Sequence, residues 1–385
     1  MIQKMKTTDL KIGMYIDNIG ASWFKHPFLN NKMVINSEDV IEKLIKSGIE
    51  YVFVDIKKSD NFLKIDKSHV AFGVEKEKAK EIYNDAKVQI HEMVDDVKKG
   101  KHLNSPQLCN LVINMASSIF RNDQALISLS RLKDYNEYIY NHSINVCLLC
   151  LAMGGKSDLD DEEMLHLGLG GLLHDVGLMR LPPSLLSPDH VPTEDEILLL
   201  RKHPHESAKI LEKEKLSKET ISIALHHHER FNGEGYPQRL KGKQIGTFGF
   251  IIRIADFYDH ITNKWHNHEA LPPSDAIKMI LQGSQSHFSP LYASLFLECL
   301  GMYPIGTLVE LNTKEIGIVM ENNRNSAMRP RILLLTDAHG IPLMNKTLID
   351  LSDTDNTIKE KKIDHALNPK SLGINPEEYL DSYNG

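Results

Sequence analysis

Between Gln107 and Leu300 apolar residues recur at helical spacing, and the blocks of β-branched residues that are typical of strands are few. Such a periodicity, sustained over about 190 residues, predicts an all-α domain. The periodicity changes on both sides of this stretch, and 385 residues are enough for two or three domains. We therefore predict a mainly α protein, in which a helical domain is flanked by a small N-terminal α+β module and a small C-terminal β module.

The flanking segments carry strand and turn signals. YVFVDI (51–56) is typical of a buried strand, and the segment from Ser37 to Lys46 is typical of a helix. After Gly301 the short apolar runs YPIGTLVELN, IGIVMEN and RPRILLLTD are separated by Gly, Asn and Pro, as strands of a small sheet would be. The predicted divisions are an α+β module (1–65), a connecting helix and linker (66–119), the helical domain (120–300), a β module (301–352) and a loosely held tail (353–385).

Charge and hydrophobicity exclude several classes of protein. A net charge of −7 provides no basic field for tracking a polymeric nucleic acid. The longest apolar runs, such as Val146 to Met153, are shorter than the roughly 20 residues that a membrane-spanning helix needs, and the N-terminus has no signal-peptide apolar core. We therefore expect a cytoplasmic protein with neither polymeric nucleic acid nor membrane as a partner. Cys147 and Cys150 have CxxC spacing but lie in an apolar helical run, which predicts helix packing rather than zinc or redox chemistry.

Histidine is concentrated in the helical stretch. Thirteen of the 19 histidines lie between His142 and His287, where an even spread would place roughly half that number. His174 and Asp175 stand side by side in the apolar run LGLGGLLHDVGL (167–178), and a buried polar pair in such a run needs partners. A metal centre would supply them, because a carboxylate can bridge two cations while neighbouring imidazoles hold one each.

Other segments of the same domain carry further candidate ligands. Taken singly, each of these residues could be a satisfied core histidine or a helix cap, but five separate segments in one helical domain favour a shared centre. Imidazole and carboxylate together suit iron, manganese or zinc rather than calcium. The additional candidates are His142, His203, the run His226, His227 and His228, and Asp256.

The motifs HSINV, LLHDVG, KHP, HHERFNGEGYP and IADFYD follow one another in this order. With these spacings the helical domain resembles the HD-GYP family, a branch of the HD metal-dependent phosphohydrolases. The N-terminal elements SWxxHPF and YVFVD resemble the uncharacterised domain that precedes one subgroup of this family. The segment that begins YPIGTLVEL resembles the C-terminal extension of the same subgroup.

The resemblance implies hydrolysis of a cyclic dinucleotide, usually cyclic di-GMP, to linear pGpG and sometimes on to GMP. It also implies two divalent metal ions, iron or manganese before zinc, and a metal-bridging hydroxide that attacks phosphorus. Some family members bind a third metal through a Glu one turn before the first His, but Tyr138 occupies that position and Glu137 lies one place off, so we expect two metals. The metal ligands implied here are His142, His174, Asp175, His203, His227, His228 and Asp256, with Asp175 bridging as the catalytic carboxylate, whereas His226 precedes the motif.

Four positions on the substrate side depart from the family. Leu178 stands where the family usually has Lys, Phe250 where it has Arg, and Asn232 where it has Asp, while NKWHNH (263–268) replaces a segment rich in Arg and Tyr. Losing two phosphate-facing cations would cost about 10²-fold or more in binding or rate unless other groups compensate. The substrate-binding candidates are Arg230, Gly235, Tyr236, Pro237, Arg253, Lys241 and Lys264.

These departures leave more than one function open. The intact ligand set favours an active phosphodiesterase for cyclic di-GMP, or for cyclic GMP-AMP if the pocket has changed. The alternative is a catalytically impaired protein that binds cyclic dinucleotides or contacts partners such as diguanylate cyclases. A mononucleotide substrate is disfavoured by the GYP element. The charged helix at 75–99 is long enough to pair two copies of the chain, so a homodimer is a further hypothesis.

Overall fold

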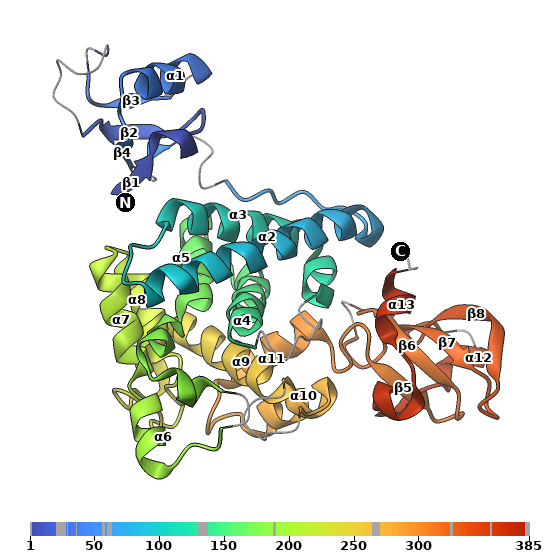
Figure 1. The fold of residues 1–385 in the computed structure, drawn as a ribbon. Helices are drawn as coiled ribbons and strands as arrows, with labels where there is room; N and C mark the ends of the chain where they lie inside the picture. The colour runs from blue at the N-terminus through green and yellow to red at the C-terminus, as the bar shows by residue number, and fades with distance from the viewer. Residues whose placement is uncertain are drawn as a thin grey trace.

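The computed structural model describes residues 2–20, 28, 30–35, 37–55, 58–59, 64–129, 138–187, 190–263, 270–323, 326–354 and 356–381. A helical domain forms the centre of the molecule, and a small antiparallel sheet module adjoins it at each end of the chain (Figure 1). This arrangement confirms the predicted fold class. Within the described ranges no helix combines the length and apolar character that crossing a membrane requires.

The N-terminal module is a four-stranded antiparallel sheet covered by one helix. Its strand order is β1-β4-β2-β3. Ile16, Val54 and Leu44 are fully buried between the sheet and the helix, so the alternating pattern of the strands builds this small core. Apart from Phe28, the SWxxHPF element lies outside the described residues. The elements are β1 (Ile2–Lys6), β2 (Tyr15–Asn18), β3 (Met33–Val34), α1 (Glu38–Lys46) and β4 (Tyr51–Asp55).

The helical domain surrounds one nearly all-apolar helix, α4 (Tyr138–Gly155), which is buried from Asn141 to Gly154. Cys147 and Cys150 lie in this buried stretch, which confirms that they are packing residues. The long helices α2 and α3 lie together along one side of α4 (Figure 1). The other α-helices of the domain are α2 (Phe72–Lys98), α3 (Ser105–Leu129), α5 (Asp161–Leu173), α6 (Glu194–Leu200), α7 (His203–Lys213), α8 (Lys218–His226), α9 (Gly246–Thr262), α10 (Pro273–Gln282) and α11 (Pro290–Leu300).

The C-terminal module is a five-stranded antiparallel sheet of order β8-β7-β6-β5-β9. The expectation of a loosely held tail from residue 353 is wrong, because β9 pairs with β5 inside this sheet. Although the segment is charged, Ile363 and Ala366 pack against the apolar core that α9 and α11 share with this sheet. Tyr379 and Leu380 of α13 pack on the sheet itself. The elements are β5 (Leu308–Leu311), β6 (Ile316–Glu321), β7 (Arg331–Thr336), β8 (Pro342–Asp350), α12 (Asn356–Lys359), β9 (Ile363–Ala366) and α13 (Pro376–Asp381).

Candidate metal centre

The seven side chains that the sequence singles out as metal ligands come together on one side of the helical domain. His142 lies in the first turns of α4, and Asp256 lies within α9. His174 and Asp175 follow α5 directly, and His203 is the first residue of α7. The remaining two, His227 and His228, follow the end of α8.

The end of α5 delivers the His-Asp pair into the core. This helix begins at a capping box made by Asp160 and Glu163, and every residue from Met164 to Leu173 is buried. Two residues after Asp175, Gly177 lets α7 approach closely, since a Cβ at this position would lie 2.3 Å from the backbone oxygen of His203. The glycine of HDVG therefore sets how near His203 comes to Asp175.

The ligand atoms form two sets, one on each side of the Asp175 carboxylate. Asp175 Oδ2 lies 3.4 Å from His174 Nε2 and 3.8 Å from His142 Nε2, and His142 Nε2 lies 3.3 Å from Asp256 Oδ1. Asp175 Oδ1 lies 3.1 Å from His203 Nε2 and 3.5 Å from His227 Nε2. One carboxylate oxygen thus faces each set, which is the geometry that a bridging ligand requires.

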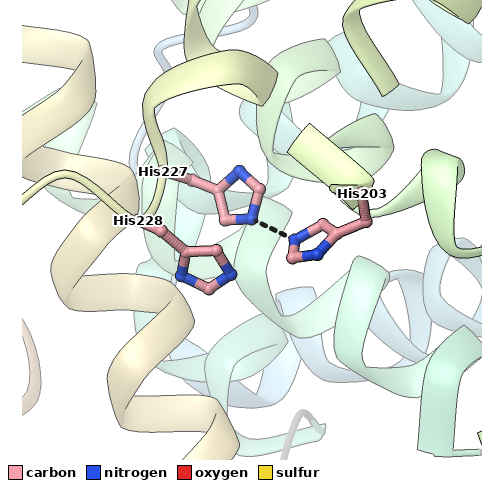
Figure 2. A group of neighbouring side chains, drawn as sticks. All are labelled: His203, His227 and His228. Carbon is pink, nitrogen blue, oxygen red and sulfur yellow. Dashed lines mark hydrogen bonds between the residues drawn. The ribbon is translucent and has the colours of Figure 1, made fainter. Parts of the chain in front are cut away.

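His228 completes the second set. Its ligand nitrogen lies within 4.8 Å of those of His203 and His227, and its Nδ1 lies 3.5 Å from Asp256 Oδ2. Figure 2 shows these three rings converging. His203 Nε2 and His227 Nε2 lie 3.0 Å apart.

Hydrogen bonds fix which imidazole nitrogens carry protons. The Nδ1 atoms of His174, His203 and His227 each face a backbone carbonyl at 2.7–2.8 Å, those of Gly171, Leu200 and Ala224. A carbonyl only accepts, so each Nδ1 donates and each neutral ring turns an Nε2 lone pair toward the centre. Two such lone pairs 3.0 Å apart repel each other unless a cation lies between them. The donors therefore fit a bound metal ion.

The buried carboxylate points to the same conclusion. Asp175 Oδ1 is buried and has no hydrogen-bond donor among the described residues. Burial opposes its charged form, but positive charge at His174 and His203 outweighs burial and holds the pKa of this carboxyl well below its usual range. When these rings are neutral, a cation bound between them and Asp175 would supply that charge. Burial lowers the pKa of His227 to about 4, which keeps that ring in the neutral form that binds metals. An anion and neutral imidazoles in one buried cluster form a cation site.

The position one turn before His142 carries no carboxylate. Tyr138 occupies it, with its ring stacked on His142 at 5.3 Å and its hydroxyl hydrogen-bonded to His260 Nδ1 at 3.0 Å. Glu137 lies outside the described residues.

A cavity of about 370 Å³ opens over the metal ligands. Leu178, where the family usually has Lys, lines it, whereas Phe250 stacks between Phe231 and Tyr292 and is not among the lining residues. Among the described residues, three arginines line it, Arg201, Arg230 and Arg253. Of the other substrate-binding candidates, Tyr236 lines the cavity, Gly235, Pro237 and Lys241 do not, and Lys264 lies outside the described residues.

A buried glutamate holds the loop that carries Gly235, Tyr236 and Pro237, the GYP loop, in place. Glu229 is fully buried and accepts hydrogen bonds from the backbone nitrogens of Gln238 and Leu240. Gly235 passes so close to this acid that a Cβ on it would lie 2.5 Å from Glu229 Cα. The loop therefore holds the Tyr236 ring 4.7 Å from that of His228, measured between centroids. The Arg201 guanidinium lies over the Tyr236 ring, 5.6 Å from its centroid.

Sequence reasoning missed three residues of this site. Asp259 accepts a hydrogen bond from His142 Nδ1 at 2.7 Å, and its sequence signals are its place at the end of the motif IADFYD and one turn after Asp256. Glu229 could have been noticed as an acid directly after the histidine run, and Arg201 as a cation two residues before His203. Each of them acts through tertiary contacts that the motif pattern does not reveal.

His226 provides a direct test of the ligand assignment. Its Nδ1 shares a hydrogen bond with Ser222 Oγ at 3.0 Å, and it belongs to neither ligand set. We expect His226→Ala to bind the same number of metal ions as the parent, whereas His227→Ala should lose the ion held with His203. Metal content per chain, measured by elemental analysis after removal of free metal, distinguishes the two variants. Equal loss in both would contradict the assignment.

Three family models match the chain. Residues 119–291 match an HD domain, residues 2–107 match a domain of unknown function (DUF3391), and residues 308–374 match a KOW domain associated with the HD domain. The matches follow one another along nearly the whole chain.

Individual relatives and solved structures resemble the chain over different lengths. A cyclic di-GMP phosphodiesterase of Pseudomonas aeruginosa is 29% identical over 91% of this chain and 89% of its own. A 3'3'-cGAMP-specific phosphodiesterase of Vibrio cholerae is 30% identical over 41% of this chain and 30% of its own. Among solved structures, an HDGYP protein of Bdellovibrio bacteriovorus is 18% identical, with a TM-score of 0.48 over 77% of this chain and 98% of its own. Residues 119–291 of the chain thus match the HD domain family, and the segments on either side match domains of their own.

Proposed function

We propose that this protein is a metal-dependent phosphodiesterase that hydrolyses cyclic di-GMP to linear pGpG. The observation that carries the proposal is the pair of ligand sets on either side of Asp175 at the base of an arginine-lined cavity. The Pseudomonas aeruginosa relative, which matches over most of both chains, is named for this activity. Incubation of the metal-loaded chain with cyclic di-GMP, followed by chromatography of the products, tests it, and the expected product is pGpG.

The chain's own residues would hold two divalent cations, iron or manganese before zinc. His142, His174 and Asp256 would hold one, and His203, His227 and His228 the other, with Asp175 shared. Such cations supply an activated water and neutralise charge on phosphoryl oxygens. Because that water would be the nucleophile, no side-chain nucleophile is needed.

The arginines of the cavity would bind the substrate's phosphates. Arg253 is 9% exposed, lines the cavity and has a buried Nε without a hydrogen-bond partner among the described residues. A buried guanidinium with a free donor is a site for an anion. Arg253 lies one helical turn before Asp256, so it would hold a phosphate close to the metal ligands. It would thereby replace the cation that the family has at the position of Phe250.

Loss of the Arg253 cation should weaken substrate binding. We expect Arg253→Gln to raise KM for cyclic di-GMP about 10- to 100-fold, the equivalent of a charge-assisted hydrogen bond of about 1.5–3 kcal/mol. Arg253 Nη1 also lies 3.6 Å from Asp256 Oδ2, so the metal content of the variant is measured on the same preparation. Arg180→Gln removes an exposed cation outside the cavity and serves as the matched control. An unchanged KM in Arg253→Gln would contradict the phosphate assignment.

Cyclic GMP-AMP is the second candidate substrate. The observation that favours it is Leu178, which gives the cavity an apolar wall where the family has a phosphate-facing Lys. The ratio of kcat/KM for the two cyclic dinucleotides decides between them. A higher value for cyclic di-GMP supports the first substrate, and a higher value for cyclic GMP-AMP supports the second.

A further inference from the structure

A buried chain of hydrogen bonds runs from the connecting helix α2 to the ligand set of the first metal position. Tyr83 of α2 donates its hydroxyl proton to Asn145 Oδ1 at 3.3 Å. Asn145 Nδ2 donates to Asp259 Oδ1 at 2.9 Å, and Asp259 Oδ2 accepts from His142 Nδ1 at 2.7 Å. We propose that Tyr83 and Asn145 are positioning residues for His142, which make the affinity of one metal position depend on where α2 lies. This inference rests on the metal centre of the proposed function.

The direction of each bond in the chain is determined by chemistry. A carboxylate only accepts, so Asp259 must accept a hydrogen bond from Asn145 on one oxygen and from His142 on the other. The amide of Asn145 must then turn its nitrogen toward Asp259, which leaves its oxygen facing Tyr83. The phenol hydroxyl is the matching donor. His142 can consequently present only its Nε2 lone pair to the metal position.

Burial makes the geometry of this series of hydrogen bonds sensitive to small displacements. Tyr83 and Asn145 are each 2% exposed, and Asp259 is 4% exposed. Water therefore cannot readily replace a lost partner, and an unpaired group in such surroundings would turn to find another one. A turn of Asn145 would release one oxygen of Asp259, and His142 would lose the acceptor that orients its ring.

Two further contacts fix the position of α2 on the helical domain. Glu75, in the first turn of α2, is 2% exposed and accepts hydrogen bonds from Ser118 Oγ and from Arg121 Nε, both at 2.6 Å. The His91 ring stacks on Tyr140 of α4 with 3.7 Å between centroids. The helix α2 follows the N-terminal module in the chain and leads into the helical domain. Because the Tyr83–Asn145 bond is already 3.3 Å long, a slide of α2 by about 1.5 Å, the rise of one residue, would stretch it beyond hydrogen-bond length.

Cobalt titration of the metal-free, full-length chain tests the proposal. The parent should bind two equivalents of Co²⁺, followed through the visible absorption of the bound ion. Tyr83→Phe removes one oxygen atom and keeps the ring, so the metal-free variant should stay folded, with a melting temperature lowered only by the loss of one buried hydrogen bond. We expect it to bind one equivalent of Co²⁺ as the parent does and the other about 10-fold more weakly. Loss of a hydrogen-bond partner of a metal ligand typically lowers metal affinity by about this factor or more.

Tyr292→Phe is the matched control, because it removes a hydroxyl that binds Thr247 between α11 and α9. It should titrate as the parent does. If Tyr83→Phe also matches the parent, or weakens both equivalents alike, the positioning role is overturned. A parent that binds no Co²⁺ would instead overturn the metal centre itself.

Hydrogen exchange tests the coupling from the other end. By linkage, metal binding should hold α2 more firmly if α2 helps to position His142. We expect added Co²⁺ to slow amide exchange in α2 around Tyr83, and Tyr83→Phe to remove this effect while the slowing in α4 remains. Metal-induced slowing in α2 that persists in the variant would contradict a link through Tyr83.

Discussion

Replacing His174 and Asp175 together by Ala should abolish both metal retention and hydrolysis. Each ligand set would lose the shared carboxylate, and the first set would also lose an imidazole. Ligands that bridge two cations cannot be replaced by water in a buried centre, so we expect the rate to fall by at least about 10³-fold. Elemental analysis and product chromatography on the same preparation measure both effects.

His166→Ala is the control for this variant, because His166 is also buried and lies on α5, but it belongs to neither ligand set. It should keep its metals and its activity. If the double variant hydrolysed substrate at the parent rate, the metal ligands would lie elsewhere in the chain.

The second large effect is expected at Gly235. A Cβ at this position would lie 2.3 Å from Arg230 N and 2.5 Å from Glu229 Cα, distances at which the backbone itself must move. In Gly235→Ala the GYP loop would shift, and with it Tyr236, which lies against His228, and Arg230 of the cavity. Because a displacement of about 1 Å can cost 10²-fold in rate, we expect at least that loss in kcat/KM.

Gly155→Ala provides the comparison for Gly235→Ala. A Cβ at Gly155 meets only the Phe120 ring, at 3.4 Å, which is ordinary contact. This variant should keep the parent's activity. A Gly235→Ala protein with parent kcat/KM would show that the close approach of this loop to Glu229 does not matter for function.

Much of this fold could be predicted from the sequence, because its elements have strong local patterns. The helical period predicts the central domain, and YVFVDI predicts β4. The tail was mispredicted because Ile363 and Ala366 stand among charged residues, and their burial depends on β9 reaching β5, far away in the sequence. Local composition carries no information about such a pairing.

The candidate site divides in the same way. The ligand residues have motif signatures, and the structure brings all seven together. Arg201 and Tyr83 have no such signature, and Asp259 closes the motif IADFYD without its role being evident from it, because these roles depend on which helices become neighbours. The predicted homodimer and the contact with diguanylate cyclases stay predictions, since a single chain carries no partner's surface.

Stepwise metal addition tests the central claim most directly. The metal-free chain is titrated with Mn²⁺ in the presence of cyclic di-GMP, and bound metal and linear product are measured at each step. Because both oxygens of Asp175 face a ligand set, we predict that hydrolysis appears only as the second equivalent binds. Two bound equivalents without hydrolysis, while the nucleotide still binds, would contradict the account, as would full activity in the metal-free chain.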